Sequence, residues 1–129
     1  MELINTQPAF SAEIELGRNL VRTYFRGHVT GAEMAAVLPS VDRLLGQLKP
    51  GFTVLADLSA VDSLDLDSGP SFSKLMDLCR IHGVGKIVRI IPSPAQDFGI
   101  NILSIIHYRG KVPIATYKTL AEAEHELAG

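Results

Sequence analysis

The feature that most constrains the fold is a near-continuous apolar run at 52–58 (FTVLADL), which lies between two stretches with helical periodicity. A strand that is apolar on both faces is typical of the buried centre of a parallel sheet. Parallel neighbours need long crossover connections, usually helices. The chain has 129 residues, of which 47% are hydrophobic and 20% charged, as in an ordinary packed globule. We therefore predict one α/β domain over 1–129.

Strand and helix patterns alternate along the rest of the chain. Residues 1–8 are expected to form a loose N-terminal lead-in, followed by an antiparallel hairpin whose short link is 17–19. Strands are expected at 10–16, 20–29, 52–58, 86–91 and 112–117. Helices are expected at 31–48, 70–82, 94–109 and 120–127. The order ββαβαβαβα predicts a mostly parallel sheet with right-handed crossovers and the first strand antiparallel at an edge.

Local signals set the helix boundaries. Thr30 with Glu33, and Thr119 with Glu122, have the spacing of capping boxes. Ser68 is expected to cap the helix that begins at Pro70. Pro39 lies inside the first helical pattern, so we expect that helix to kink or split near 38.

One face of the sheet is expected to be open. In the second strand, apolar Val21 and Phe25 alternate with polar residues, so the two sets face opposite sides. A sheet covered on both faces would carry few such charges. The pattern predicts helices mainly on one face and a partly polar face opposite, and burial of both Arg22 and Arg26 under a helix would contradict this.

The acid- and serine-rich segment after the central strand is the candidate site, because ligands and modifications gather at the carboxyl ends of such strands. We predict that the 57–73 loop and helix start contact a partner. The candidate regulatory residues are Asp57, Ser59, Ser63, Asp65, Asp67 and Ser68. Asp62, Asp65 and Asp67 could bind a cation, but the spacing lacks the glycine and distal glutamate of an EF-hand. A solvated loop with turn and cap serines is the alternative interpretation, and we predict no metal site.

No pattern predicts catalysis or a cofactor. The glycine-rich phosphate motif and the nucleophile elbow are both missing. Cys79 lies on an apolar helical stripe and is expected to be buried and inert. The four histidines fall on different elements without a ligand-type pair. They are His28, His82, His107 and His125.

The net charge and the hydropathy of the chain bear on which classes of partner it can bind and on where in the cell it is located. A net charge of −2 gives no general attraction to nucleic acid or to an anionic membrane. No apolar run is long enough to span a bilayer, and the N-terminus lacks the pattern of a signal peptide. We expect a cytoplasmic protein.

The expected third helix is apolar around more of its circumference than one core face requires. It could form a homodimer interface, line a pocket for an apolar ligand, or be buried within its own domain. The candidate interface or pocket residues are Phe98, Ile102, Leu103 and Ile106.

The segment 54–61 (VLADLSAV), followed by Leu64-Asp65 and by 67–69 (DSG), resembles a STAS domain. More specifically it resembles the SpoIIAA-like branch of the anti-sigma factor antagonists, bacterial regulators whose pattern is an apolar strand, Asp-Leu-Ser, and then Asp-Ser-Ser-Gly at a helix start. The resemblance covers almost the whole chain. It implies a right-handed βα superhelix with helices largely on one side.

In the signalling members of this family, a partner kinase that is also an anti-sigma factor phosphorylates the second serine of the motif. If Asp65 matches the motif aspartate, that position is Asp67; if Asp67 matches, it is Gly69. The resemblance thus predicts a non-enzymatic interaction module with a protein partner, an anti-sigma-factor-like kinase among the candidates. The alternative is a domain that binds a small apolar ligand or lipid beside the third helix.

Overall fold

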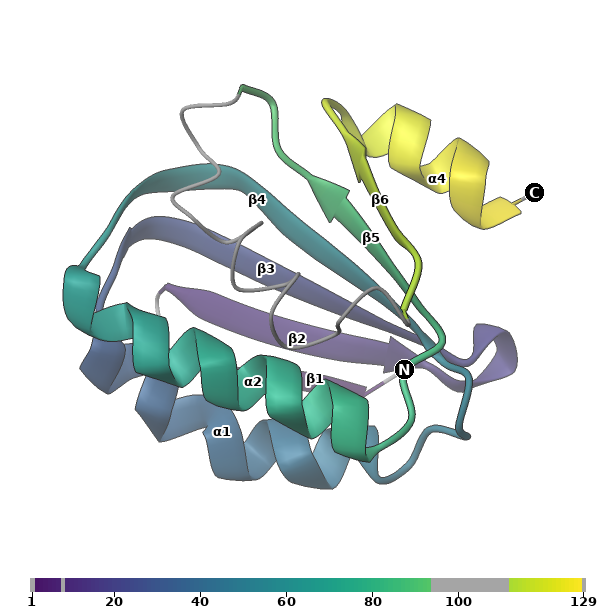
Figure 1. Ribbon diagram of the computed structural model, residues 1–129, viewed down its shortest axis with the longest axis horizontal. Helices are drawn as coiled ribbons and strands as arrows, with labels where there is room; N and C mark the ends of the chain where they lie inside the picture. The colour runs from purple at the N-terminus through teal and green to yellow at the C-terminus, as the bar shows by residue number, and fades with distance from the viewer. Residues whose placement is uncertain (1, 8, 94–111, 129) are drawn as a thin grey trace.

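A six-stranded mixed sheet organises the computed structural model, which describes residues 2–7, 9–93 and 112–128 (Figure 1). The strands lie in chain order across the sheet: β1 (Glu2–Gln7), β2 (Phe10–Glu15), β3 (Leu20–Val29), β4 (Thr53–Leu64), β5 (Lys86–Ile90) and β6 (Ile114–Tyr117). The pairs β1–β2 and β2–β3 are antiparallel, and the strands from β3 to β6 are parallel. The described helices are α1 (Gly31–Leu45), α2 (Gly69–Ile81) and α4 (Leu120–Ala128), with short 3-10 turns η1 (Leu16–Arg18) and η2 (Leu66–Ser68).

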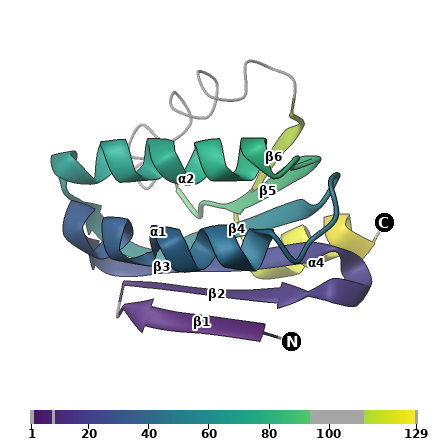
Figure 2. The same ribbon diagram turned by 90° about the horizontal axis from the view of Figure 1, so that it is seen from below.

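Helices α1 and α2 lie side by side over one face of the sheet (Figure 2). Their apolar stripes and the facing strands form the larger core, which includes a row of three aromatic rings. The ring centroids of Phe10 and Phe25 are 5.2 Å apart, and those of Phe25 and Phe72 are 5.4 Å apart. Helix α4 packs on the opposite face, where Ala123 joins a smaller cluster with Leu20, Leu55, Val88 and Ile90.

The hairpin and the parallel strands agree with the sequence-based expectation, but two boundaries do not. The expected lead-in forms strand β1, so β1 and not β2 lies at the edge of the sheet. Strand β4 continues to Leu64, where a loop was expected from Ser59 onward. The end of β3 supplies its partners, with Arg26 opposite Ala60 and Val29 opposite Leu64, across two shifts of register.

The first helix is also not split. Helix α1 runs through Pro39 from Gly31 to Leu45, so its end falls three residues before the expected one. Val37 and Val41, on either side of the proline, are both buried in the core, while Pro39 itself is exposed. Packing of both halves against the same sheet therefore holds the helix together despite the lost backbone donor.

The caps of α1 and α4 form as expected. Thr30 Oγ1 accepts a hydrogen bond from the Glu33 backbone amide at 3.2 Å, and Thr119 Oγ1 accepts one from Glu122 at 3.2 Å. The expected third helix, with Phe98, Ile102, Leu103 and Ile106, lies outside the described residues. Among the helices that the structure describes, none combines the length and the apolar character needed to cross a membrane.

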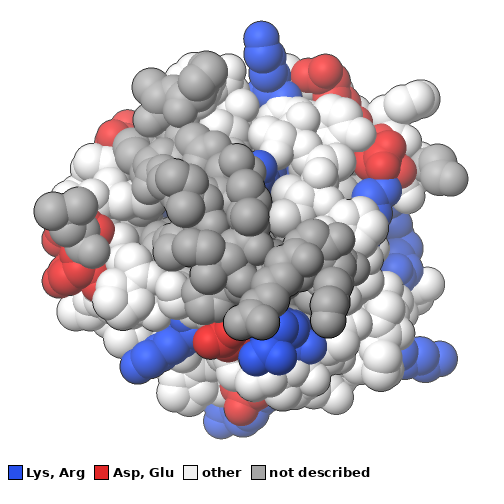
Figure 3. Space-filling model, in the orientation of Figure 1, with Lys and Arg blue, Asp and Glu red and all other residues white. Residues whose placement is uncertain are grey.

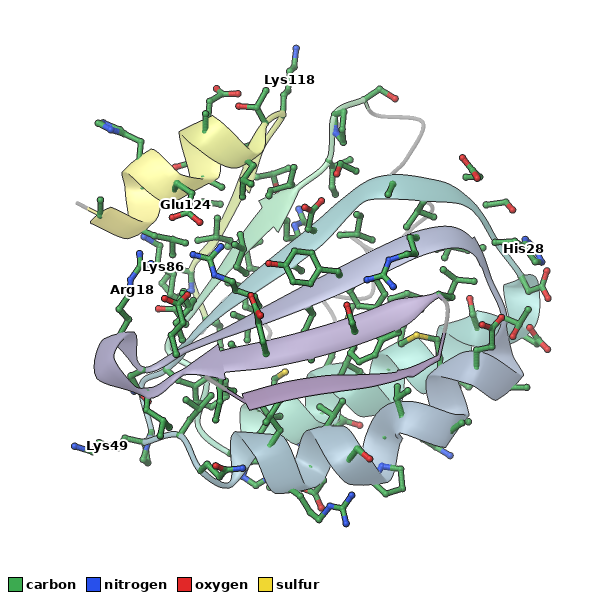
Figure 4. The ribbon with its side chains drawn as sticks, turned by 180° about the vertical axis from the view of Figure 1, so that it is seen from behind. Arg18, His28, Lys49, Lys86, Lys118 and Glu124 are labelled. Atoms are coloured by element: carbon green, nitrogen blue, oxygen red, sulfur yellow. The ribbon has the colours of Figure 1, made fainter. Side chains whose placement is uncertain are left out.

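The face opposite α1 and α2 is open in part. Arg22, with only 12% of its side chain exposed, lies between Glu15 of β2 and Glu124 of α4. Arg26 stays partly exposed and donates a hydrogen bond to Ser11 Oγ at 2.5 Å. Helix α4 therefore covers part of the face that we expected to be open (Figure 4). Tyr24 and Arg26, farther along β3, remain partly exposed.

Candidate functional site at the carboxyl end of the sheet

The candidate segment lies where β3 and β4 end and where α1 and α2 begin, at the left of Figure 1. The two strands are parallel neighbours, so both chains leave the sheet at the same edge. Figure 3 shows acidic side chains at this edge of the molecule. Two helix N-termini and several carboxylates thus come together at one place.

Asp67 connects this segment to α1. Its Oδ1 accepts a hydrogen bond from the backbone amide of Gly31, the first residue of α1, at 3.2 Å. Ser71 Oγ donates to the carbonyl of the same glycine at 3.2 Å. A carboxylate at a helix N-terminus is stabilising by about 0.3–1 kcal/mol. Asp67 is nevertheless exposed at the surface.

The approach of the segment to Gly31 is close. A Cβ atom built on Gly31 would lie 2.5 Å from the Asp67 carbonyl oxygen and 2.9 Å from its carbonyl carbon. Any residue other than glycine would push the two segments apart. The absence of a side chain at Gly31 therefore allows the close contact with Asp67, which joins positions 36 residues apart.

Ser68 does not cap α2 as expected. Its backbone is helical, with φ −75° and ψ −20°, and its side chain makes no capping bond. The hydroxyl donates instead to the Asp65 carbonyl at 2.6 Å, and the side chain is almost fully buried. The prediction was wrong because η2 already winds the chain into helical geometry before α2, whereas a capping residue needs extended backbone.

Ser63 and Asp65 meet a histidine that the sequence did not single out. His28 Nδ1 lies 2.5 Å from Ser63 Oγ, and His28 Nε2 lies 2.7 Å from Asp65 Oδ1. The cause is the β3–β4 register, which pairs His28 with Ser63. The expected parallel pairing of 20–29 with the strand after the first helix was the one signal that could have brought His28 near Ser63. Two shifts of register separate the His28–Ser63 pair from the regular part of the β3–β4 ladder, so the pair could not be read from the sequence.

Asp57 and Ser59 form a separate pair earlier in β4. Asp57 Oδ1 accepts from the Ser59 backbone amide at 2.9 Å and from the Ser59 hydroxyl at 2.6 Å. The structure thus places Ser63 and Asp65 with His28, and Asp67 with Gly31, while the Ser68 side chain is buried. Asp62 is exposed. Within the described ranges, no three His, Cys, Asp or Glu side chains are grouped closely enough to hold a metal ion.

A network of ion pairs lies at the other end of β3. Arg22 Nε donates to Glu15 Oε2 at 2.6 Å, and its Nη1 contacts Glu124 Oε1 at 2.5 Å. The hydrogen bond from Arg22 lowers the pKa of Glu15 below its ordinary value. In Figure 4 the labelled Arg18 and Glu124 lie on the opposite side of the molecule from His28. This network ties α4 to the sheet and does not reach the candidate site.

An apolar hollow lies between the sheet and the α1–α2 layer, with walls that include Phe72, Met76 and Ile87. Its volume is about 60 Å³. Pockets for drug-sized ligands measure roughly 300–1,000 Å³. This hollow is therefore too small to hold a ligand of that size.

Of the known proteins compared with this chain, those that match it are solved structures with a similar fold. No protein-family model and no curated protein sequence matches the chain. An uncharacterized protein of the DUF3478 family with a SpoIIAA-like fold, from Shewanella loihica, superposes with a TM-score of 0.70 at 16% identity, over 96% of this chain and 98% of its own.

Two anti-sigma factor antagonists are also similar. SpoIIAA in its unphosphorylated form has a TM-score of 0.60 at 15% identity, over 94% of this chain and 99% of its own. The antagonist from Mycobacterium paratuberculosis has a TM-score of 0.55 at 15% identity, over 97% of this chain and 100% of its own. The α/β sheet with its parallel strands and paired helices therefore has the SpoIIAA-like fold that the resemblance implied.

Proposed function

We propose that this protein is a non-enzymatic interaction module that binds a protein partner through the 57–73 loop and helix start. One observation carries the proposal. The segment is fixed from within by Asp67 on Gly31 and by Asp65 on His28, while Asp62 and Asp67 remain exposed. A surface that is already ordered loses little conformational entropy when a partner binds.

The chemistry of the surface indicates a basic partner. Exposed carboxylates at an interface accelerate association with a positively charged surface and make it sensitive to salt. The two similar structures named as anti-sigma factor antagonists support a regulatory role through the shared fold. The family resemblance favours a kinase that resembles an anti-sigma factor as the partner. We propose that the two proteins interact in the cytoplasm.

We further infer that the negative charge at this site is permanent. The position that corresponds to the family's phosphorylated serine is Asp67 or Gly69, and neither can be phosphorylated as a serine is. Phosphoserine carries roughly −1.5 to −2 charges near neutral pH, against −1 for aspartate. With Asp67 bound to the start of α1, the module would present one fixed state of charge rather than two.

The experiment uses two variants that separate charge from architecture. Asp62→Lys reverses an exposed charge. Asp67→Asn removes a charge but keeps an oxygen that can accept the Gly31 amide. We expect both to weaken capture of the native partner from a lysate, measured as the amount of one specific protein retained, with an unchanged melting temperature.

The matched control for Asp62→Lys is Asp42→Lys, which makes the same change of net charge on an exposed position of α1 beside His82. It should retain wild-type binding. Equal loss in Asp42→Lys would reduce the effect to general charge, and wild-type binding by both loop variants would disprove the proposal.

A further inference from the structure

Ser63, His28 and Asp65 form a hydrogen-bonded chain whose chemistry the interaction module does not use. The hydroxyl of Ser63 lies 2.5 Å from one ring nitrogen of His28, and the Asp65 carboxylate lies 2.7 Å from the other. The three residues come from β3, β4 and the turn after β4. The His28 side chain is 53% exposed and that of Asp65 is 41% exposed, so a solvent-borne molecule can reach the group.

The contact with Asp65 assigns one proton position on the ring. A carboxylate can only accept hydrogen bonds, so His28 Nε2 has to carry the hydrogen that lies toward Asp65. When the ring is neutral, Nδ1 then has a free lone pair, and the Ser63 hydroxyl at 2.5 Å can donate to it. This is the arrangement in which an imidazole removes a proton from a serine as that serine attacks.

The turn that supplies Asp65 is itself held in place. The Asp65 amide donates to the Val29 carbonyl at 3.0 Å, and the Ser68 amide and hydroxyl both donate to the Asp65 carbonyl, at 3.0 and 2.6 Å. His28 is fixed by its strand pairing with Ser63. Backbone contacts therefore help to position all three residues, in addition to the hydrogen bonds between their side chains.

We propose that Ser63 is a nucleophile activated by His28 and that it accepts an acyl group from small activated esters. In this step a bond forms between Ser63 Oγ and the carbonyl carbon of the ester. The hydroxyl proton passes to His28 Nδ1, the bond from the carbonyl carbon to the leaving oxygen breaks, and the leaving group departs with that bond's electrons. His28 then returns the proton to solvent or to the leaving group, and Ser63 remains as its ester.

Two other sites in the protein contain only part of the serine–histidine–aspartate arrangement. His82 Nε2 also lies 2.7 Å from a carboxylate, that of Asp42, but no hydrogen bond from a serine to His82 is present among the described residues. Ser59 is exposed, and its hydroxyl donates to the Asp57 carboxylate at 2.6 Å. Ser59 is therefore the internal control for an accessible serine whose hydroxyl is bonded to a carboxylate.

The test treats the folded, full-length protein with 4-nitrophenyl acetate and follows acetylation of each serine by peptide mass mapping. General-base assistance is worth roughly a hundredfold or more. We expect Ser63 to be acetylated at least about tenfold faster than Ser59 in the wild type. His28→Gln should reduce the Ser63 rate to that of Ser59, and Asp65→Asn should reduce it in part.

Equal rates at Ser63 and Ser59 in the unaltered protein would overturn the proposal, and this comparison does not depend on any variant folding. A Ser63 rate that is unchanged in His28→Gln would overturn it as well. Acetylation reports the chemistry of Ser63 and not partner capture, so failure here leaves the interaction module standing.

Discussion

Replacement of Gly31 by alanine tests how the candidate site is joined to α1. In most helix positions alanine is better than glycine by up to about 1 kcal/mol. At Gly31 the new Cβ would lie 2.5 Å from the Asp67 carbonyl oxygen, which is backbone and cannot rotate away. The turn has to move by roughly 1 Å to restore an ordinary contact, as overpacked sites do.

This movement also weakens two hydrogen bonds, from the Gly31 amide to Asp67 and from Ser71 to the Gly31 carbonyl, each 3.2 Å long. Overpacking costs about 1–3 kcal/mol, and loss of a helix-end bond costs about 1 kcal/mol. After the gain in helix propensity, we expect Gly31→Ala to lower the free energy of unfolding by about 2 kcal/mol. The melting temperature should fall by roughly 6–10 °C.

Gly69→Ala is the matched control. Gly69 is likewise the first residue of its helix, but a Cβ there meets no atom within 4 Å. It should be neutral or stabilising by up to about 1 kcal/mol. Urea unfolding of both variants measures the difference. If Gly31→Ala proved as stable as Gly69→Ala, the close contact between the turn and α1 would not exist, and the internal fixation of the site would be disproved.

Two further predictions concern the scaffold. The pKa of Glu15 is lowered in the folded protein by the hydrogen bond from Arg22, so its stabilisation is present above the unfolded value of about 4.3 and is lost as the pH falls through the folded value. The difference in unfolding free energy between wild type and Glu15→Gln should therefore shrink between pH 7 and pH 3, and an unchanged difference would contradict the assignment. Phe25→Ala should cost about 3–5 kcal/mol, because the ring is buried between Phe10 and Phe72. Leu16→Ala, at a position 62% exposed, should change stability by less than about 0.5 kcal/mol in the same denaturation assay.

The candidate site shows where sequence-based prediction succeeds and where it stops. The segment after the apolar run leads to the carboxyl edge of the sheet as expected, because one apolar run with a helix on each side has few other solutions, but β4 continues to Leu64 before the chain leaves the sheet. The roles of individual residues were not all predicted. Ser68 was expected to cap α2 and instead bonds back to Asp65, since the 3-10 turn before it depends on how the segment packs against α1.

The amino-acid sequence by itself determined the local features: the alternation of the β2–β3 hairpin and the caps at Thr30 and Thr119. Each depends on residues a few positions apart, so periodicity and hydrogen-bonding capacity are sufficient to specify it. The parallel direction of the later strands followed from the alternation of strand and helix patterns, because parallel neighbours need long crossover connections. Only the tertiary structure decided that β4 extends to Leu64, that His28 meets Ser63, and that Asp67 binds Gly31. These contacts join residues 35 and 36 positions apart across a ladder with two register shifts, and such shifts arise from the packing of the whole sheet rather than from any local pattern.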